Sequence, residues 1–361
     1  MKVLLLGDVS PTKITNGYFE KQDIDALFSD SLSLFKKADF TFVNLECALT
    51  ESENAIDKFG PNLKATDKTA DVLKKIGVSL VGLSNNHIFD FGIEGYKDTV
   101  KALDRVGLDY TGFGENYDDS RKNYVLEKDG QKICFITVCE HEYSYALPDR
   151  MGSRPFDCYD TITDVRKAKE QNDKVIVIYH GGKEHCRYPS PRMVKLCHAL
   201  VDNGADVVIG QHSHCICCYE DYNNGHILYG QGNFHFVEFY DNLPDWENQL
   251  AFIYDTDTNE VELVPLNQTK TGIELSKGNK KENLEKMSES LNASMKDGSW
   301  IDGWRDFCKE KEEYYNNKFR LAFADGATER QFKVVAHLLD CEAHHDVIVE
   351  NHKTTNHTNE K

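Results

Sequence analysis

Several side chains that bind metal ions well stand directly after hydrophobic runs of the chain. His212 and His214 follow the run 206–209, and His180 follows the run 174–179. In an extended segment, residues i and i+2 point to the same side, so His212 and His214 could reach one cavity. A lone His-x-His pair is equally compatible with two ordinary polar residues at a strand end. The pair therefore gains meaning only from the other strand ends.

Three oxygen donors occupy the same kind of position earlier in the chain. Each follows a hydrophobic run: Asp8 after 3–6, Glu46 after 40–43 and Asn86 after 78–83. The ordinary alternatives are that an Asp or Asn begins a turn and that a Glu starts a solvated loop. Parallel strands in α/β proteins carry their ligands at the carboxyl edge of the sheet, so all six donors are expected in one pocket.

The donor set indicates the kind of metal. Six oxygen and nitrogen donors without a thiolate suit two divalent ions such as Mn, Fe or Zn. Two such ions about 3.5 to 4 Å apart clamp a phosphoryl group and ionise a water. Glu46 is the predicted bridging carboxylate because, apart from Asp8, it is the acid that best follows a central strand. The predicted ligands are Asp8, Glu46, Asn86, His180, His212 and His214.

Other polar residues near these positions have less certain roles. His87 stands next to Asn86, and an amide beside an imidazole can provide one ligand and one proton donor, although asparagines are also common in turns. His141 and Glu142 either line the site or belong to a surface loop, and Glu184 and His185 are expected just outside the ligands. The cluster 215–218 is expected to be a strand with small buried thiols rather than a soft-metal site.

Alternating strands and helices predict an α/β protein. Helical spacing of apolar residues predicts helices over 23–37, 94–106, 164–171 and 191–203. A hairpin is expected around Asp129-Gly130, and a second antiparallel pair is expected over 250–255 and 261–265. The glycine-rich turn 230–234 lacks the third glycine and following helix of a dinucleotide fingerprint, so it is expected only to bring the chain back to the site.

Composition limits the possible partners and location. The 361 residues carry a formal net charge of -18, concentrated in residues 1–269, and no basic stripe is present, which argues against binding to a nucleic-acid duplex. The eleven cysteines have no regular spacing and favour a reducing cytoplasm. The first residues become polar too soon for a signal peptide, and no run reaches the roughly 20 apolar residues that cross a bilayer. Direct membrane insertion is therefore not expected.

The character of the chain changes near residue 270. Helices are predicted over 282–295, 300–319 and 329–339. We expect a domain over 1–270 that carries the site, a helical extension over 271–341, and a frayed polar tail over 342–361. A lid or a contact in a homo-oligomer would fit the extension. The tail contains four histidines, for which metal binding is not expected: His344, His345, His352 and His357.

The ordered motifs around the donors resemble a known family. They are Gly7-Asp8, Asn44-Leu45-Glu46, Asn85-Asn86-His87 with Asp90 and Gly92, His180-Gly181-Gly182 with Glu184, Gly210-Gln211-His212-Ser213-His214, and Gly230-Gln231-Gly232-Asn233-Phe234. As a series over residues 1–270 they resemble the CapA family of poly-gamma-glutamate capsule proteins, which is similar to the calcineurin-like metallophosphatases.

The resemblance implies a four-layer α/β/β/α fold with two metal ions between the sheets. One ion would take Asp8, Glu46 and His214, and the other Glu46, Asn86, His180 and His212. His87 would act as general acid or oxyanion partner, oriented by Asp90. Two positions depart from the usual phosphatase pattern, because Ser10 replaces a histidine and Glu46 replaces a bridging aspartate. The first ion is therefore expected to bind weakly.

These features lead to one hypothesis and two rivals. The hypothesis is a metal-dependent hydrolase in which a metal-bound hydroxide attacks the phosphorus of a small or polymeric phosphate ester and His87 assists the leaving oxygen. The first rival is a factor in capsule or poly-gamma-glutamate biosynthesis. The second is a binding protein that retains the metal cavity without turnover.

Overall fold

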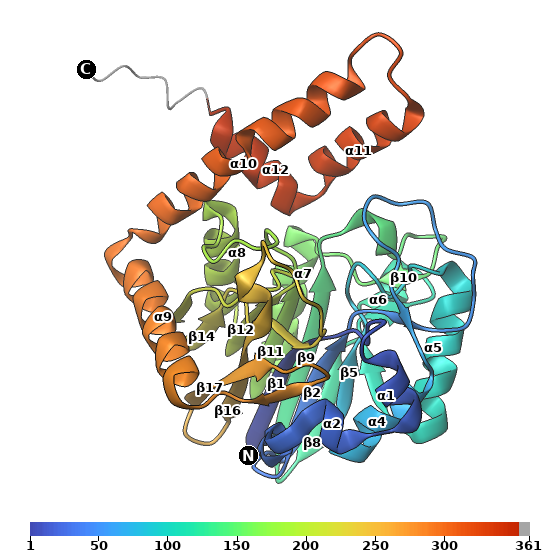
Figure 1. Ribbon diagram of the computed structural model, residues 1–361. Coiled ribbons are helices and arrows are strands. Elements are labelled where there is room, and N and C mark those ends of the chain that lie inside the picture. The colour runs from blue at the N-terminus through green and yellow to red at the C-terminus, as the bar shows by residue number, and fades with distance from the viewer. Residues whose placement is uncertain (354–361) are drawn as a thin grey trace.

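The computed structural model describes residues 1–353, and His357 lies outside the described residues. The body of the molecule contains two large β-sheets flanked by helices, and a group of helices stands above it (Figure 1). Among residues 1–353, no helix is long and apolar enough to span a membrane.

The first sheet has eight strands in the order β18-β17-β16-β1-β2-β5-β6, with β15 also paired to β1. Strands β1, β2, β5, β6 and β15 run parallel to one another. Strands β16, β17 and β18 each pair antiparallel with their neighbours and form one edge of the sheet. Their bounds are β1 Lys2–Val9, β2 Phe40–Leu45, β5 Leu80–Gly82, β6 Asp109–Thr111, β15 Asn233–His235, β16 Asn248–Asp255, β17 Glu260–Gln268 and β18 Ile273–Leu275.

The second sheet has six strands in the order β13-β14-β12-β11-β9-β8. Its central strands β9, β11, β12 and β14 are parallel, and β8 and β9 form the hairpin predicted around Asp129-Gly130. The bounds are β8 Tyr124–Lys128, β9 Gln131–Cys139, β11 Lys174–His180, β12 Val207–Gln211, β13 Tyr219–Tyr222 and β14 Gly225–Leu228. Two small pairs lie outside both sheets: β3 Ala48–Leu49 with β4 Lys64–Ala65, and β7 Phe113–Gly114 with β10 Gly152–Ser153.

The alternating side chains of β1 explain why the two sheets stack. Val3 and Leu5 lie in the core between the sheets, together with Phe42 and Phe135, whose ring centroids are 6.3 Å apart. Leu4 belongs to a separate core on the opposite face of the first sheet. Because both faces are covered, the central strands are hydrophobic at successive positions instead of at alternate ones.

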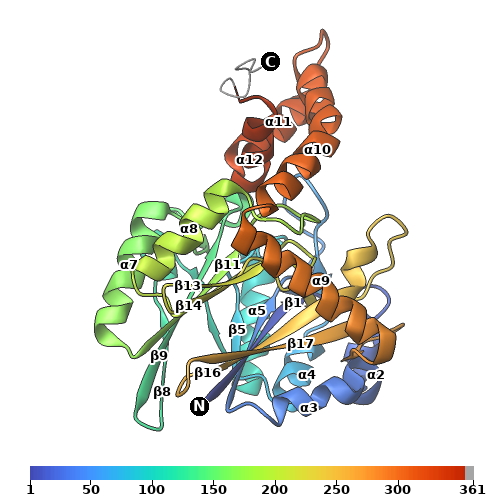
Figure 2. The ribbon, with the colours of Figure 1, turned by 90° about the vertical axis from the view of Figure 1, so that its left-hand side faces the viewer.

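Helices cover the outer face of each sheet (Figure 2). Those against the first sheet are α1 Asn16–Lys21, α2 Ile24–Phe28, α3 Leu32–Phe35, α4 Lys68–Ile76 and α5 Gly92–Val106, and those against the second are α7 Cys158–Gln171 and α8 Pro191–Asp202. A short helix, α6 Tyr117–Ser120, contacts β7 and β10. These layers confirm the predicted four-layer α/β/β/α fold.

The chain after the last strand is helical. The helices are α9 Gly278–Asp297, which contacts β13 and β17, and then α10 Trp300–Ala322, α11 Glu329–Asp340 and α12 Glu342–Asn351. The expected frayed tail is wrong for 342–351, because α12 buries Val347 completely and leaves His344 only 9% exposed. Strand β18 continues the first sheet past residue 270, and the division into domains stays a prediction.

Two local predictions were also wrong. The helix expected over 23–37 is broken into α2, a 3-10 turn and α3, because Ser29 has a φ of 46°, which no α-helix accommodates. The cluster 215–218 is not a strand: Ile216 forms one isolated bridge to Gln231. The prediction that its thiols are buried is confirmed, because Cys215, Cys217 and Cys218 are all buried.

Candidate metal centre

The six predicted ligands come from the carboxyl ends of strands in both sheets. Asp8 is the penultimate residue of β1, and His180 is the last residue of β11. The others follow their strands: Glu46 after β2, Asn86 after β5, and His212 and His214 after β12. Five of the six side chains are buried, and Asn86 is partly exposed. The side chains therefore meet between the two sheets at their common edge.

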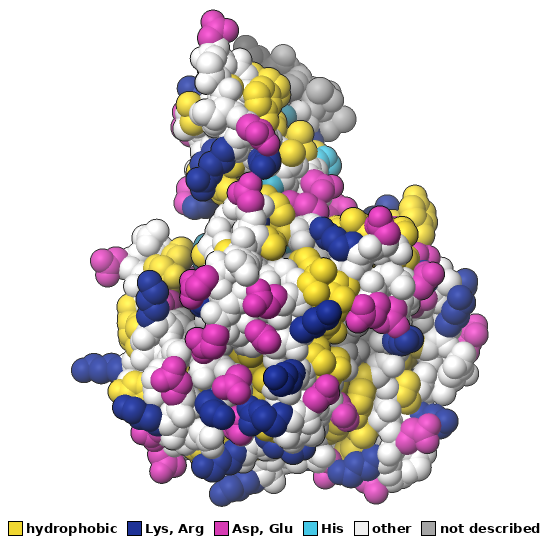
Figure 3. All heavy atoms as spheres, turned by 90° about the vertical axis from the view of Figure 1, so that its right-hand side faces the viewer, with side chains coloured by type: hydrophobic (Ala, Val, Ile, Leu, Met, Phe, Trp, Pro, Cys, Tyr) yellow, Lys and Arg dark blue, Asp and Glu magenta, His cyan; other side chains and the backbone are white. Residues whose placement is uncertain are grey.

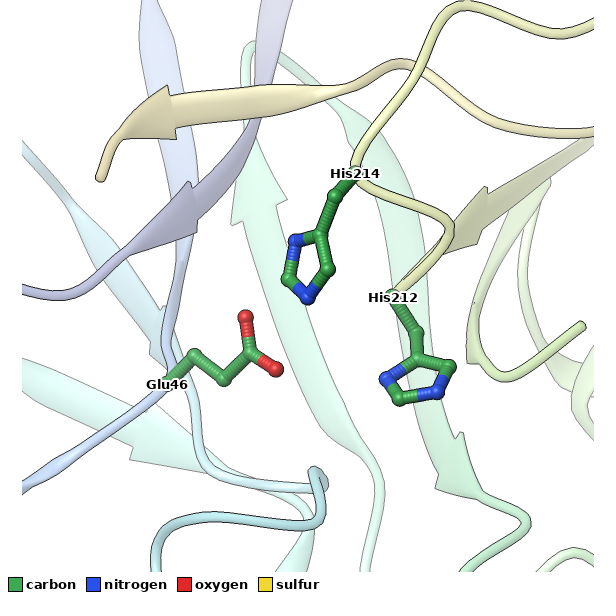
Figure 4. Close-up of side chains that lie close together, drawn as sticks. All are labelled: Glu46, His212 and His214. Atoms are coloured by element: carbon green, nitrogen blue, oxygen red, sulfur yellow. The ribbon is translucent and has the colours of Figure 1, made fainter. Parts of the chain in front are cut away.

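Glu46 is shared by two compact groups of donors. Ligand atoms of Asp8, Glu46 and His180 lie within 4.8 Å of one another, and so do those of Glu46, His212 and His214. Figure 4 shows both of the latter imidazoles directed toward the carboxylate of Glu46. The central position of Glu46 suits a carboxylate that bridges two ions. The division of the histidines between the groups differs from the one that the resemblance implies, so the ligand set of each ion stays a prediction.

The carboxylate of Glu46 has no hydrogen-bond partner. Both oxygens are buried without one, although His180 Nε2 lies 3.3 Å from Oε1. Burial by itself raises the pKa of this carboxyl, but nearby His180 and His214 outweigh it and hold the pKa at about 2. An ionised, buried carboxylate without hydrogen bonds is costly unless a cation accompanies it. This residue therefore fits a metal site better than a structural role.

Asp8 is held in place by Asn44, a motif residue for which the sequence predicted no separate role. Asn44 Nδ2 donates to Asp8 Oδ1 at 2.8 Å, and the backbone N of His212 donates to Asp8 Oδ2 at 3.2 Å. Burial and the charge of Glu46 raise the pKa of Asp8 to about 6. Two carboxyl groups with opposite pKa shifts share one buried site, and this arrangement favours the binding of a cation.

Asn86 and His180 meet across the two sheets. Asn86 Oδ1 lies 2.8 Å from His180 Nε2, the same nitrogen that faces Glu46. Asn85 fixes this turn, because its Oδ1 accepts from the backbone N of His87 at 3.1 Å, and its Nδ2 donates to the carbonyl of Leu45 at 2.8 Å. One asparagine thus shapes the loop while its neighbour points into the site.

His212 and His214 do not reach the site by extension of the strand. Their φ values are 80° and 53°, so the segment leaves β12 in a left-handed conformation, and the extended i, i+2 geometry expected from the sequence is wrong. Such values are uncommon for residues other than glycine and persist where the surroundings enforce them. The two rings still lie together, with centroids 5.8 Å apart.

Each of these imidazoles has an outer partner. His214 Nδ1 lies 2.8 Å from Asn233 Oδ1, so the glycine-rich turn returns to the site as expected. His212 Nε2 lies 3.0 Å from His141 Nε2, while His212 Nδ1 is buried without a partner. Burial, together with neighbouring imidazoles, lowers the pKa of both His141 and His212 well below the usual value. His141 therefore lies against a predicted ligand.

His87 and Asp90 form a pair beside the predicted ligands. His87 Nδ1 lies 2.6 Å from Asp90 Oδ2, and Lys58, from a loop that sequence reasoning passed over, contacts Asp90 Oδ1 and lies 3.1 Å from His87 Nδ1. Burial and the charge of Lys58 lower the pKa of His87. Because Nδ1 faces Asp90 and Lys58, Nε2 is the nitrogen left for a ligand.

The residues given secondary roles fall into two groups. Glu184 Oε1 lies 3.9 Å from His212 Nε2, and the His185 ring is tilted against that of His214, with centroids 6.1 Å apart. Glu142 points away to the helical extension, where it lies 2.7 Å from His337 Nδ1. His198 lies away from these groups, where it contacts Glu220 at 2.7 Å and stacks on Tyr222.

The residues present fit a pair of divalent cations. The donors are carboxylates, imidazoles and an amide, all from rigid strand ends, and both Glu46 oxygens and His212 Nδ1 are buried without partners. Oxygen and nitrogen donors of this kind suit Mn, Fe or Zn. Ser10, at the position where the resemblance expects a histidine, is 2% exposed and leaves one of the two groups without that imidazole.

The fold and the site define an α/β/β/α protein with a buried group of metal-competent side chains. Residues 2–238 match the family described as "Bacterial capsule synthesis protein PGA_cap", a range that includes all six predicted ligands. The chain belongs to this family, as the resemblance of its motifs indicated.

Two relatives from Bacillus illustrate the family. The chain is 29% identical over 276 residues to the "Capsule biosynthesis protein CapA" of Bacillus anthracis, covering 74% of this chain and 67% of the relative. It is 28% identical over 267 residues to the "PGA biosynthesis protein CapA" of Bacillus subtilis (strain 168), covering 72% and 70% respectively. Each alignment covers about two thirds to three quarters of both proteins.

Solved structures with a similar arrangement are more distant. A putative 5'-nucleotidase from Staphylococcus aureus superimposes with a TM-score of 0.44 at 13% identity, covering 80% of this chain and 58% of that one. A 5'-nucleotidase from Candida albicans gives a TM-score of 0.42 at 10% identity, covering 74% and 51%. Nothing about substrate or activity follows from likenesses at this level.

Proposed function

We propose that this protein is a metal-dependent hydrolase of phosphate esters. The observation that supports it most directly is Glu46, an ionised and fully buried carboxylate with no hydrogen-bond partner, shared by two groups of donors. Divalent ions in such a site supply Lewis acidity toward a phosphoryl oxygen and lower the pKa of water. Asp8, Glu46 and His214 would hold one ion, and Glu46, Asn86, His180 and His212 the other.

The remaining side chains have complementary roles in the proposal. Asp90 orients His87 through Nδ1 and leaves Nε2 facing the cavity. Since burial and Lys58 lower the pKa of His87, its proton-donating form needs a negative charge nearby, and a bound phosphate ester carries one. His87 then protonates the leaving oxygen or stabilises the negative charge that develops there.

A second candidate function rests on the relatives. They are named for capsule and PGA biosynthesis, so a role in assembling poly-gamma-glutamate is the main rival to hydrolysis. A third reading is a protein that holds metal and ligand without turnover.

Metal analysis combined with a phosphoesterase assay separates these possibilities. The purified chain is dialysed against Mn²⁺, its metal content is measured, and hydrolysis of p-nitrophenyl phosphate and bis(p-nitrophenyl) phosphate is followed. The hydrolase proposal expects about two ions, or one if the Ser10 group is weak, and metal-dependent turnover. Bound metal without turnover of either ester favours the binding or assembly role, and a chain that takes up no metal contradicts the proposal.

A further inference from the structure

A cavity of about 360 Å³ lies between the candidate metal centre and the helical extension. Its lower side includes Asn86, His87 and His212, and its opposite side includes Phe307 and Tyr314 of α10. The body and the extension therefore meet at the site itself. In the space-filling view, basic and acidic side chains lie together on the narrow part that joins them (Figure 3).

The extension is anchored to the body near this cavity. Trp304 is 1% exposed and packs in a cluster with Cys186, which follows β11. Arg192 Nε of α8 lies 2.9 Å from Asp346 Oδ2 of α12, with both side chains largely withdrawn from solvent. Hydrophobic packing and a partly buried ion pair hold the two parts together, so the cavity wall is preformed.

The lining of the cavity combines aromatic rings with positive charges. Phe59 and Tyr143 come from the body, and Phe307 and Tyr314 come from α10. Tyr314 is 44% exposed, which leaves part of its ring surface available to a ligand. Rings of this kind stack on planar groups and bury apolar area.

Three lysines, Lys58, Lys183 and Lys311, line the same cavity in a chain whose net charge is -18. Each lysine also has a carboxylate nearby: Lys58 is paired with Asp90, Lys183 lies 3.7 Å from Glu184, and Lys311 contacts Glu310 at 2.7 Å. Lys311 Nζ in addition lies over the Phe307 ring at 5.3 Å from its centroid. Cations beside aromatic rings favour a ligand that is both anionic and planar. The volume is at the lower end of the range for small-molecule sites, so a small molecule or a chain end fits and a continuous polymer does not.

We propose that the helical extension selects the substrate: α10 binds the part of a small phosphate ester that lies away from the phosphorus, and it prefers an aromatic or similarly planar group there. The inference rests on the proposed function for the position of the phosphate. It gives residues 300–322 a direct role at the site, one that the family match, which ends at residue 238, does not cover.

Binding of non-hydrolysable probes tests this selection without requiring turnover. The full chain, loaded with Mn²⁺, is titrated by calorimetry with phenylphosphonate and with methylphosphonate, which lacks the ring. We expect phenylphosphonate to bind about tenfold more tightly, a difference of about 1.4 kcal/mol. In Tyr314→Ala this preference should fall to about twofold or less, while affinity for methylphosphonate is unchanged.

A matched variant removes an aromatic side chain elsewhere on the extension. Phe323 is 71% exposed and does not line the cavity, so Phe323→Ala should retain the full preference for phenylphosphonate. Equal affinity of the wild-type chain for the two phosphonates, binding of neither, or an unchanged preference in Tyr314→Ala would overturn the inference. Ring-selective binding that Tyr314→Ala abolishes, in a chain that hydrolyses no ester, would retain the cavity assignment and remove the hydrolase.

Discussion

Replacing Glu46 with glutamine separates the cost of burying this carboxylate from its use as a metal ligand. Both oxygens are buried without a hydrogen bond, and the compensation comes from nearby imidazoles such as His180. High pH removes the proton of His180, whose pKa is raised by Glu46 against burial, and removes this compensation with it. A neutral amide of the same shape should then be easier to bury than the carboxylate.

The expected shift in Tm follows from the free-energy cost of the buried carboxylate and from the unfolding entropy of a chain of this length. Leaving a buried polar group unsatisfied costs about 1 to 3 kcal/mol and leaving a buried charge unsatisfied costs more, so we take about 1 to 3 kcal/mol as the extra cost of the carboxylate over the amide. With an unfolding entropy of roughly 2.1 cal/mol/K per residue over 361 residues, 1 kcal/mol shifts Tm by about 1.3 °C. Metal-free Glu46→Gln should therefore melt about 1 to 4 °C above the wild-type chain. Mn²⁺ at 100 times its Kd stabilises a one-site protein by about 2.7 kcal/mol, or about 4 °C, and the variant should lose most of that gain.

Thermal melts of both chains at about pH 9, with EDTA and with Mn²⁺, measure the two effects together. Glu289→Gln is the matched control, because Glu289 is exposed on α9 and its loss changes the net charge equally without touching the site. A metal-free Glu46→Gln chain that melts several degrees below the wild type would refute the reasoning, since Glu46 would then be well satisfied without a cation.

Four other variants test separate parts of the protein. Asn86→Ala should lose bound metal in a stoichiometry assay, whereas His87→Ala should keep it and lose about 10²- to 10⁴-fold in kcat. His141→Ala removes the partner of His212 Nε2 and should weaken metal affinity by about 10- to 100-fold, measured by competition with a chelator. Burial raises the pKa of Glu140 from 4.5 to about 7, so between these pH values the folded chain binds one more proton than the unfolded chain. The free energy of unfolding should therefore fall as pH rises from 4.5 to 7. In denaturant titrations, Glu140→Gln should flatten this dependence on pH.

Each of these results has an opposite that would count against the argument. Undiminished turnover in His87→Ala would remove the acid assignment, and full metal content in Asn86→Ala would remove that ligand. Unchanged affinity in His141→Ala would show that the contact with His212 does not matter for binding. An equal slope in wild type and Glu140→Gln would mean that another group takes up the proton.

The sequence determined the framework of the candidate site. Hydrophobic runs that are buried on both faces identify central parallel strands, and the residues that follow them must lie at the carboxyl edge of the sheets. This local rule was enough to bring Asp8, Glu46, His180, His212 and His214 together from four separate segments.

Only the tertiary structure decided how these donors are supported and what covers them. His141 lies 71 residues before its partner His212, and its Nδ1 lies 3.6 Å from Cys341 Sγ, 200 residues further along. Lys58 sits in a polar loop with no periodic pattern, yet it contacts Asp90 and reaches His87. Such contacts depend on how whole elements dock against one another, which local periodicity does not encode. The same docking turned a predicted polar tail into α12 and placed α10 over the site, because buried apolar faces fix helix positions only once their partners exist.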